Sequence, residues 1–140
     1  MGGVGALALV LTIDSFKGMA AVWLSTRLSP SPWAVPVSGA AAVVGHAWPV
    51  WLGFRGGMGL ATGMGAVASQ DPLAVLIAAT LAGLFKLILR HTPRATIAAS
   101  LCLPPALWLL PVTPPVFWLG TLIALLVAFR HLGDWNRIYE

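Results

Sequence analysis

Hydrophobic residues along this chain gather into long runs, which are separated by short stretches rich in proline, glycine and charge. Runs of this length and apolarity predict helices that lie in lipid. The pattern divides the chain into six segments, at about 5–26, 34–53, 59–69, 72–90, 95–111 and 116–130. The sequence therefore predicts an all-α fold, a polytopic integral membrane helix bundle in which residues 1–140 form a single transmembrane domain.

The third segment, about 59–69, differs from the others in its length. A dozen helical residues rise only ~18 Å, whereas the hydrocarbon core of a bilayer is ~30 Å thick. We therefore expect a half-helix or a tilted piece that is buried in protein. The fourth segment follows Asp71, and Pro72 suits its first helical position.

Composition supports a lipid environment and excludes other classes. The chain is 59% hydrophobic and 9% charged, with a mean hydropathy of +0.89, whereas soluble domains carry roughly 25% charged residues. The net charge of +4 does not indicate nucleic-acid binding, because the basic residues are spread singly and form no basic face. The single cysteine, Cys102, lies in an apolar run, and no Cys/His spacing suggests a metal site. We predict neither a metal nor a cofactor.

Charge distribution predicts the orientation of the chain. Six crossings would put both termini on one side, and five arginines fall on that side: Arg55, Arg90, Arg94, Arg130 and Arg137. Only Arg27 lies clearly on the other side. Because cytoplasmic loops carry the excess of Lys and Arg, the arginine-rich side is predicted to be cytoplasmic. The stretch 45–59, the turn 90–94 and the tail should then meet at one membrane face.

A glycine-rich stretch between the second and third segments is the first candidate for chemistry. Gly56, Gly57 and Gly59 would let backbone N–H groups turn toward an anion, and Arg55 could add a bidentate grip on a phosphate. The stretch opens onto the start of the third segment, where a helix N-terminus favours negative charge. Gly63 and Gly65 lie farther along that segment, and we expect them to serve helix packing.

Other polar residues stand out against the apolar background. Asp14 and Lys17 are spaced to pair on one helix face, either lining a polar pocket or joining helices as a structural ion pair. His46 and His131 are candidate general bases, although His46 also fits a structural role. If the tail is helical, His131, Asp134 and Arg137 would lie on one helix face. These three residues form a further candidate site. His91 lies in a predicted loop and is given no role.

Three motifs together resemble one known family, the acyl-phosphate:glycerol-3-phosphate acyltransferases, or PlsY family. Residues 45–62 (GHAWPVWLGFRGGMGLAT) resemble that family's second signature motif. Asp14, Lys17 and Gly18 resemble the helix after its first motif, and Arg130, His131 and Arg137 resemble its third motif. The resemblance covers nearly the whole chain.

The resemblance implies a multi-pass enzyme of the bacterial inner membrane, with its active face toward the cytoplasm. Members of the family transfer an acyl group from acyl phosphate to glycerol 3-phosphate and so form lysophosphatidic acid for phospholipid synthesis. No metal is required, no acyl-enzyme is expected, and the substrate's own phosphate is a candidate base. By this resemblance Arg55, Gly56, Gly57 and Gly59 would bind glycerol 3-phosphate, and His131 would act in catalysis.

Several positions depart from the family pattern. Met58 stands where the family has Lys, so Arg55 or Lys17 would have to supply the missing charge. Asp134 replaces an Asn and would need a partner such as Arg137, and Thr92 offers the only hydroxyl at the place of a family serine. The family's first motif is not found, so the chain reads as either truncated or a divergent paralogue.

Those departures keep a second hypothesis open. In it, the chain is a catalytically impaired relative that binds a phosphate or lipid ligand, or a partner, without turnover. A small transporter is a third possibility, but no inverted repeat supports it. Acyl-chain preference and oligomeric state do not follow from the sequence.

Overall fold

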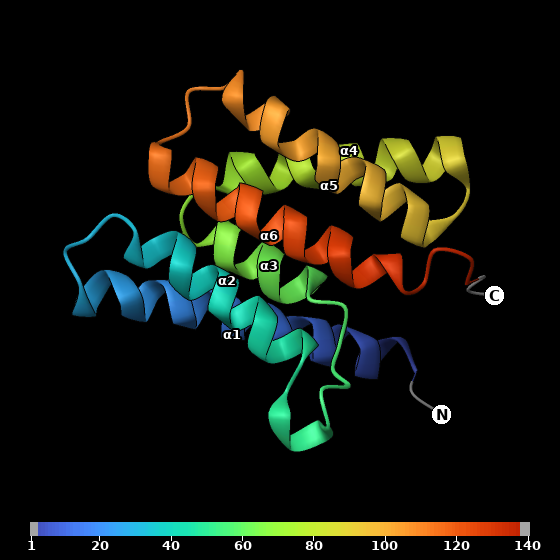
Figure 1. Ribbon diagram of the computed structural model, residues 1–140, viewed down its shortest axis with the longest axis horizontal. Helices are drawn as coiled ribbons and strands as arrows, with labels where there is room; N and C mark the ends of the chain where they lie inside the picture. The colour runs from blue at the N-terminus through green and yellow to red at the C-terminus, as the bar shows by residue number, and fades with distance from the viewer. Residues whose placement is uncertain (1–2, 138–140) are drawn as a thin grey trace.

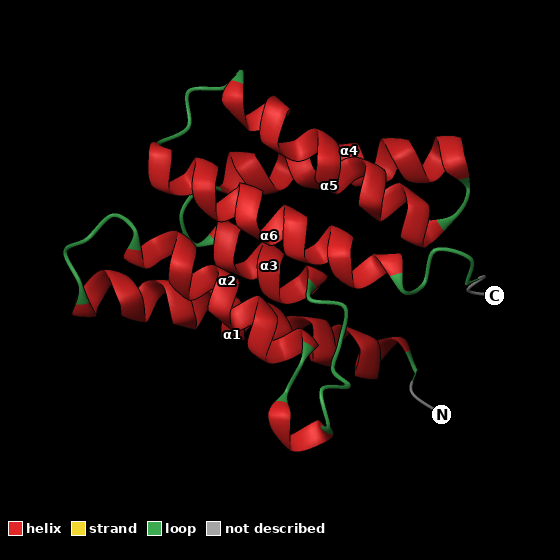
Figure 2. Ribbon diagram, in the orientation of Figure 1, coloured by secondary structure: helices red, strands yellow, loops and turns green. Residues whose placement is uncertain are grey.

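The computed structural model describes residues 3–137, which form six α-helices and one 3-10 turn and contain no strand. The helices are α1 (Val4–Leu28), α2 (Ala34–Ala47), α3 (Leu60–Ala68), α4 (Pro72–Leu89), α5 (Thr92–Trp108) and α6 (Pro114–Leu132), and the turn is Val50–Leu52. Figures 1 and 2 show them as one bundle with the short α3 at its centre. The predicted all-α fold, with one short helix, is confirmed.

Local sequence explains several helix boundaries. The Asp71 carboxylate accepts hydrogen bonds from the Leu73 and Ala74 N–H groups at 2.9 and 3.3 Å, which caps α4 one residue before Pro72. Pro114 occupies the first position of α6, where a missing N–H costs nothing. The start of α4 lies where the sequence predicted it, whereas α6 begins two residues before the expected position 116.

Two predicted segments have different ends in the structure. The second was expected to reach residue 53, but α2 stops at Ala47 because Trp48 precedes Pro49, and a residue before proline avoids the helical region. The fifth was expected at 95–111, but α5 already begins at Thr92, with Pro93 in its first turn. His46 lies in the last turn of α2, as the predicted segment allowed, whereas Thr92 and Arg94 belong to a helix rather than to the expected turn.

The tail also differs from its expected shape. Instead of continuing as a helix, α6 ends at Leu132, and the chain turns with the Asp134 N–H donating to the His131 carbonyl at 3.0 Å. Gly133 follows the helix directly and favours this stop, since glycine is a poor helix former. Asp134 and Arg137 consequently do not share a helix face with His131.

Close approach between α1 and α3 depends on two glycines. A Cβ atom on Gly18 would stand 1.9 Å from the Thr62 carbonyl oxygen, and one on Gly65 would stand 1.9 Å from the Ser15 carbonyl oxygen. Each helix thus lays a glycine against the backbone of the other, as expected for helices that pack closely in membranes. The packing role predicted for Gly63 and Gly65 is confirmed, since a Cβ on Gly63 would meet Ile123 of α6 at 2.5 Å.

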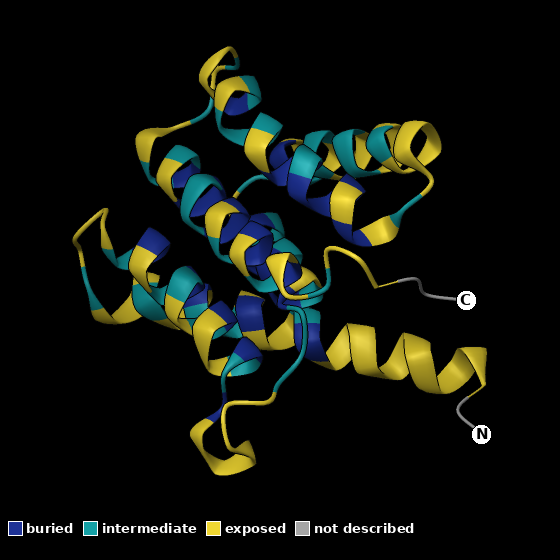
Figure 3. Cartoon of the chain, turned by 45° about the vertical axis from the view of Figure 1, so that its right-hand side comes forward, coloured by how far each residue is buried: buried dark blue, intermediate teal, exposed yellow. Residues whose placement is uncertain are grey.

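The outside of the bundle is apolar. Leu7, Val10 and Phe16 of α1 are among many large hydrophobic side chains that face outward, and the first half of α1 is exposed on every side (Figure 3). Four helical stretches within residues 3–137 are long and apolar enough to cross a membrane: α1, Ala34–Leu52, α4 and α6. The remaining two predicted segments are the nine-residue α3 and α5, which contains Pro104 and Pro105.

Side-chain contacts join the chain segments that were expected to meet at one end. Arg130 of α6 donates hydrogen bonds to the loop between α2 and α3, and Arg94 of α5 donates to the Trp135 carbonyl and the Asn136 side chain at 3.2 Å each. In Figure 1 this end of the bundle also holds both chain termini. The predicted convergence of residues 45–59, the α4–α5 turn and the tail is confirmed.

Candidate active site

A tightly folded loop, residues 48–59, returns the chain from α2 to α3. After the 3-10 turn at Val50–Leu52, Gly53 and Phe54 adopt left-handed conformations with φ of 59° and 63°, which reverses the chain direction. The Gly56 N–H then donates to the Ala47 carbonyl at 3.1 Å, and the Gly57 N–H donates to the His46 carbonyl at 3.2 Å. The loop is thereby attached to the open C-terminal end of α2.

These bonds correct the expected anion cradle. The N–H groups of Gly56 and Gly57 satisfy the carbonyls of α2 rather than turning toward a ligand. Glycine is needed at both places for space, because a Cβ would stand 2.1 Å from the His46 carbonyl oxygen at Gly56 and 2.1 Å from His46 Nε2 at Gly57. The glycines hold the loop against α2 and thereby set its shape.

Arg130 of α6 also bonds this loop, through the loop carbonyls. Its Nε donates to the Gly57 carbonyl and its Nη2 to the Gly56 carbonyl, both at 3.2 Å. A planar guanidinium suits two adjacent carbonyls, which a lysine could not match. Sequence reasoning placed Arg130 on the cytoplasmic side and in the third motif but predicted no contact with this loop.

The loop ends at an uncapped helix N-terminus. Gly59 has a φ of 79° and precedes α3 without a side-chain cap. The Gly63 N–H donates the first hydrogen bond of the helix, to the Gly59 carbonyl. The N–H groups of the first three residues of α3 therefore have no carbonyl partner within the helix. Free N–H donors and the helix dipole make this end of α3 attractive to an anion.

Asp14, Lys17 and His46 form a polar cluster beside the loop. Asp14 is 9% exposed, and its Oδ1 lies 2.9 Å from Lys17 Nζ and 3.5 Å from His46 Nδ1. Since Gly18 touches the Thr62 carbonyl, the neighbouring Lys17 lies beside the first turns of α3. The ion pair predicted between Asp14 and Lys17 is confirmed, and the Lys17 side chain remains 57% exposed.

His131 occupies the last turn of α6, next to Arg130. It is buried, and its Nδ1 lies 2.8 Å from the Val127 carbonyl. A carbonyl only accepts, so Nδ1 carries the proton of this bond and the neutral ring keeps Nε2 as an acceptor. The His131 ring is thereby held in the tautomer that a general base requires.

The other predicted site residues lie around this centre. The Asp134 carboxylate lies 3.5 Å from Arg137 Nη1, the pairing that a carboxylate near a phosphate would need. Arg55 is exposed and makes no side-chain hydrogen bond or ion pair with residues 3–137. The Thr92 hydroxyl accepts a hydrogen bond from Lys86, and no contact within the described chain joins Thr92 to the loop or to His131.

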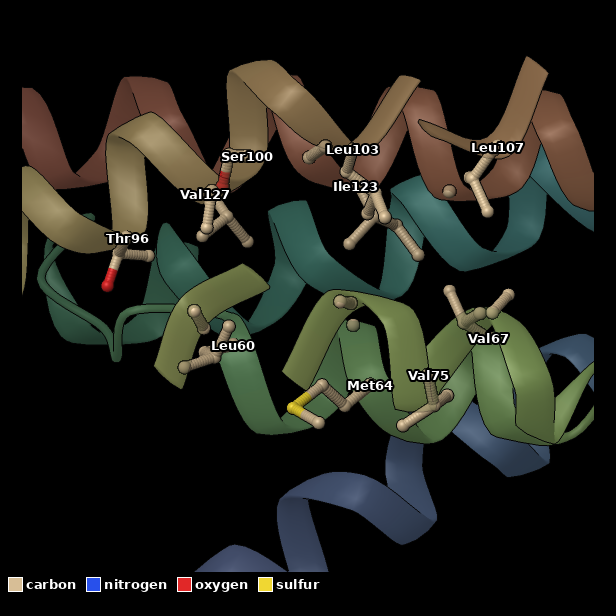
Figure 4. A pocket seen from close by; sticks show the side chains of 17 residues that line it. Leu60, Met64, Val67, Val75, Thr96, Ser100, Leu103, Leu107, Ile123 and Val127 are labelled. Atoms are coloured by element: carbon tan, nitrogen blue, oxygen red, sulfur yellow. The ribbon is translucent and has the colours of Figure 1, made fainter. Parts of the chain in front are cut away.

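An apolar pocket begins one helical turn from His131. Its cavity volume is about 60 Å³, and it is lined by α3, α4, α5 and α6. Leu60, Thr96 and Val127 line it toward the site, whereas Val67 and Leu107 line its far end (Figure 4). The hydroxyls of Thr96 and Ser100 are set in an otherwise hydrophobic wall, so the pocket suits a hydrocarbon chain with a polar end.

Comparison with known proteins gives a consistent result. The family model described as glycerol-3-phosphate acyltransferase matches residues 1–140. The glycerol-3-phosphate acyltransferase of Gloeobacter violaceus is 36% identical over 143 residues, which cover 99% of this chain and 69% of that protein. The enzyme of Neisseria meningitidis serogroup C is 39% identical, with 96% of this chain and 70% of that protein covered.

Two solved structures have the same fold. The integral membrane glycerol 3-phosphate acyltransferase PlsY in its glycerol 3-phosphate form matches with a TM-score of 0.78 and 28% identity, over 96% of this chain and 68% of that one. The lysophosphatidic acid form of PlsY matches with a TM-score of 0.76, over 93% of this chain and 67% of that one. The bundle described above is therefore the fold of a multi-pass membrane protein.

Proposed function

The chain belongs to the glycerol-3-phosphate acyltransferase family, and we propose that it transfers an acyl group from acyl phosphate to glycerol 3-phosphate. The products are lysophosphatidic acid and inorganic phosphate. The observation that carries this proposal is the meeting of three features at one end of the bundle: an uncapped helix N-terminus, a buried histidine and an apolar pocket.

The phosphate of glycerol 3-phosphate is bound at the start of α3. The uncapped N–H groups there and the exposed ammonium of Lys17 supply positive potential. Lys17 compensates for Met58, whose thioether cannot bind phosphate as the family's lysine would. Gly56, Gly57 and Gly59 shape the loop, His46 supports it, and Arg55 attracts the anion from the exposed side.

The acyl phosphate donor lies with its hydrocarbon chain in the pocket between α3, α4, α5 and α6. Its carbonyl end then faces Val127 and the adjacent turn of α6, which carries His131. The two hydroxyls in the pocket wall are near the start of α5, on the side of the site. Thr92, one turn before Thr96, is a polar group at the same end of α5.

The reaction is a single displacement at the acyl carbonyl carbon. The 1-hydroxyl oxygen of glycerol 3-phosphate forms a new ester bond, and the bond from the carbonyl carbon to the phosphate oxygen breaks. His131 Nε2, or the departing phosphate itself, takes the hydroxyl proton. Asp134 and Arg137, which pair with each other beyond α6, keep the charge balanced near the phosphates.

The site is proposed to face the cytoplasm of a bacterial inner membrane. Arg55, Arg90 and Arg94 lie at the site's end of the bundle, and Arg27 lies at the opposite end of α1. This is the asymmetry of basic residues that marks the cytoplasmic side. Glycerol 3-phosphate, being water-soluble, would enter from there.

An assay with defined substrates tests the proposal. Purified protein in detergent receives palmitoyl phosphate and radiolabelled glycerol 3-phosphate, and labelled lysophosphatidic acid is extracted and counted. We expect product from the wild type, a loss of about 10²–10⁴-fold for His131→Ala, and near-normal activity for the control His91→Ala. Binding of glycerol 3-phosphate without product would instead support the alternative of a non-catalytic relative.

A further inference from the structure

The carboxylate of Asp14 has more partners than its charge requires. One ammonium, Lys17 Nζ at 2.9 Å, is enough to neutralise a buried carboxylate on an apolar helix. His46 Nδ1 nevertheless lies 3.5 Å from the same oxygen, Oδ1. Lys17 is a neighbour on α1, whereas His46 comes from the last turn of α2, so this second contact connects two helices.

His46 is the residue on which the glycine loop rests. Its carbonyl accepts the Gly57 N–H at 3.2 Å, and its ring edge fills the space where a Gly57 side chain would stand, 2.1 Å from Nε2. The ring therefore has Asp14 on its Nδ1 side and the loop on its Nε2 side. A ring that rotated away from Asp14 would remove the support beneath Gly57.

The contacts continue from the loop to α6. The carbonyls of Gly56 and Gly57 accept both hydrogen bonds from Arg130, and His131 is the next residue. A continuous series of contacts thus runs from Asp14 of α1 through His46 and the loop to the turn of α6 that carries His131. Asp14 itself is buried, on the apolar helix α1.

We propose that Asp14 is a positioning residue, which fixes the His46 ring and through it the glycine loop in the conformation that receives glycerol 3-phosphate. This inference rests on the proposed function for its substrate, but the positioning itself is a property of the loop. Asp14 does not touch the substrate. Its effect is transmitted by the orientation of one imidazole ring.

Hydrogen exchange of the loop amides measures this positioning without any turnover. We expect Asp14→Asn, which keeps the shape of the side chain, to speed exchange in the peptide covering residues 48–59 by about ten-fold. The control Thr12→Val lies on the same helix, where the Thr12 hydroxyl bonds only the Ala8 carbonyl, and should leave the loop unchanged. Lys17→Met should also leave loop exchange unchanged if the contact with His46 is the one that matters.

A second variant, at His46, tests the same contact if the Asp14→Asn protein does not fold. His46→Asn removes the ring but keeps Asp14 paired with Lys17, and it should speed loop exchange by the same factor. Combining the two substitutions should add nothing further, because both remove one series of contacts. A double variant whose effect is the product of the single effects would overturn the proposal.

Kinetics separate this inference from the proposed function. In an active enzyme, Asp14→Asn should raise the KM for glycerol 3-phosphate about ten-fold and leave the KM for acyl phosphate unchanged. A wild type without acyl transfer would defeat the proposed function, while the exchange experiment would still decide the role of Asp14. Loop exchange that is equal in wild type, Asp14→Asn and His46→Asn would overturn the positioning role.

Discussion

Arg130 makes the link between the glycine loop and α6 with one side chain. Its guanidinium bonds two adjacent carbonyls, and it is half-buried, so water competes weakly for these bonds. A hydrogen bond to a charged group is worth about 1.5–3 kcal/mol. The residue thus stabilises the loop through bonds that involve neither Lys17 nor the first turn of α3.

Replacing Arg130 should weaken substrate binding before it affects the fold. We predict that Arg130→Met raises the KM for glycerol 3-phosphate by about 10–100-fold, the equivalent of about one charged hydrogen bond. Arg27→Met, at the opposite end of α1, should leave the KM unchanged, because the Arg27 guanidinium lies over the Trp23 ring and makes no hydrogen bond or ion pair among residues 3–137. Steady-state kinetics check both, and equal KM values for wild type and Arg130→Met would contradict this role.

Individual site residues were predictable from the sequence to different degrees. His131, Lys17 and the glycines were found because charged, imidazole and glycine residues are rare in apolar runs and match a family motif. The support that His46 gives to Gly57 was not predictable, because it depends on the ring fitting a space that only folding creates. The role of Arg130 was missed because an arginine at a helix end is usually explained by membrane orientation.

The crossing of α1 and α3 brings the backbones of these two helices into close contact. Gly18 and Gly65 allow it, since each lies against a carbonyl of the other helix. Helices in lipid gain little from the hydrophobic effect, so they depend on such close backbone packing. The small residues were visible in the sequence, but their partner helix was not, because a glycine does not specify which helix it contacts.

A larger side chain in this crossing should separate α1 from α3. We predict that Gly65→Leu lowers the thermal unfolding temperature in detergent, since overpacking costs about 1–3 kcal/mol or more when backbone must move. Gly83→Leu on α4 is the matched control, because a Cβ there meets nothing within 4 Å. An unfolding temperature for Gly65→Leu that equals the control's would show that the crossing tolerates separation.

Helix ends were predicted well where a side chain caps them and poorly where the chain turns for tertiary reasons. Asp71 and Pro72 identify the start of α4 from local chemistry alone. The end of α2 at Ala47 was missed because the apolar run continues through Val50–Leu52. The side chains of that run are exposed rather than packed in the bundle, so hydrophobicity there carries no information about helix length.

The whole bundle has a polar end and an apolar body. The glycine loop, the Asp14 cluster, the end of α6 and the mouth of the pocket all lie at the end that carries most arginines. This polarity was predictable, because the side on which each charge falls follows from counting segments. The pocket was not, since its lining comes from four helices that the sequence does not pair.

Labelling from each side of the membrane tests the orientation. In a Cys102→Ser background, a cysteine introduced by Arg55→Cys should react with an impermeant maleimide only in inverted membrane vesicles. Arg27→Cys should react only in right-side-out cells, because the two residues lie at opposite ends of the bundle. The reverse pattern would put the site outside the cytoplasm.

The most direct measurement of the central claim counts both products of one reaction. Purified protein is given palmitoyl phosphate and glycerol 3-phosphate, and lysophosphatidic acid and inorganic phosphate are quantified together by mass spectrometry and a phosphate assay. Acyl transfer predicts equal amounts of the two products, and both should fall together in His131→Ala. Phosphate release without lysophosphatidic acid, or neither product despite measurable binding of glycerol 3-phosphate, would contradict the account.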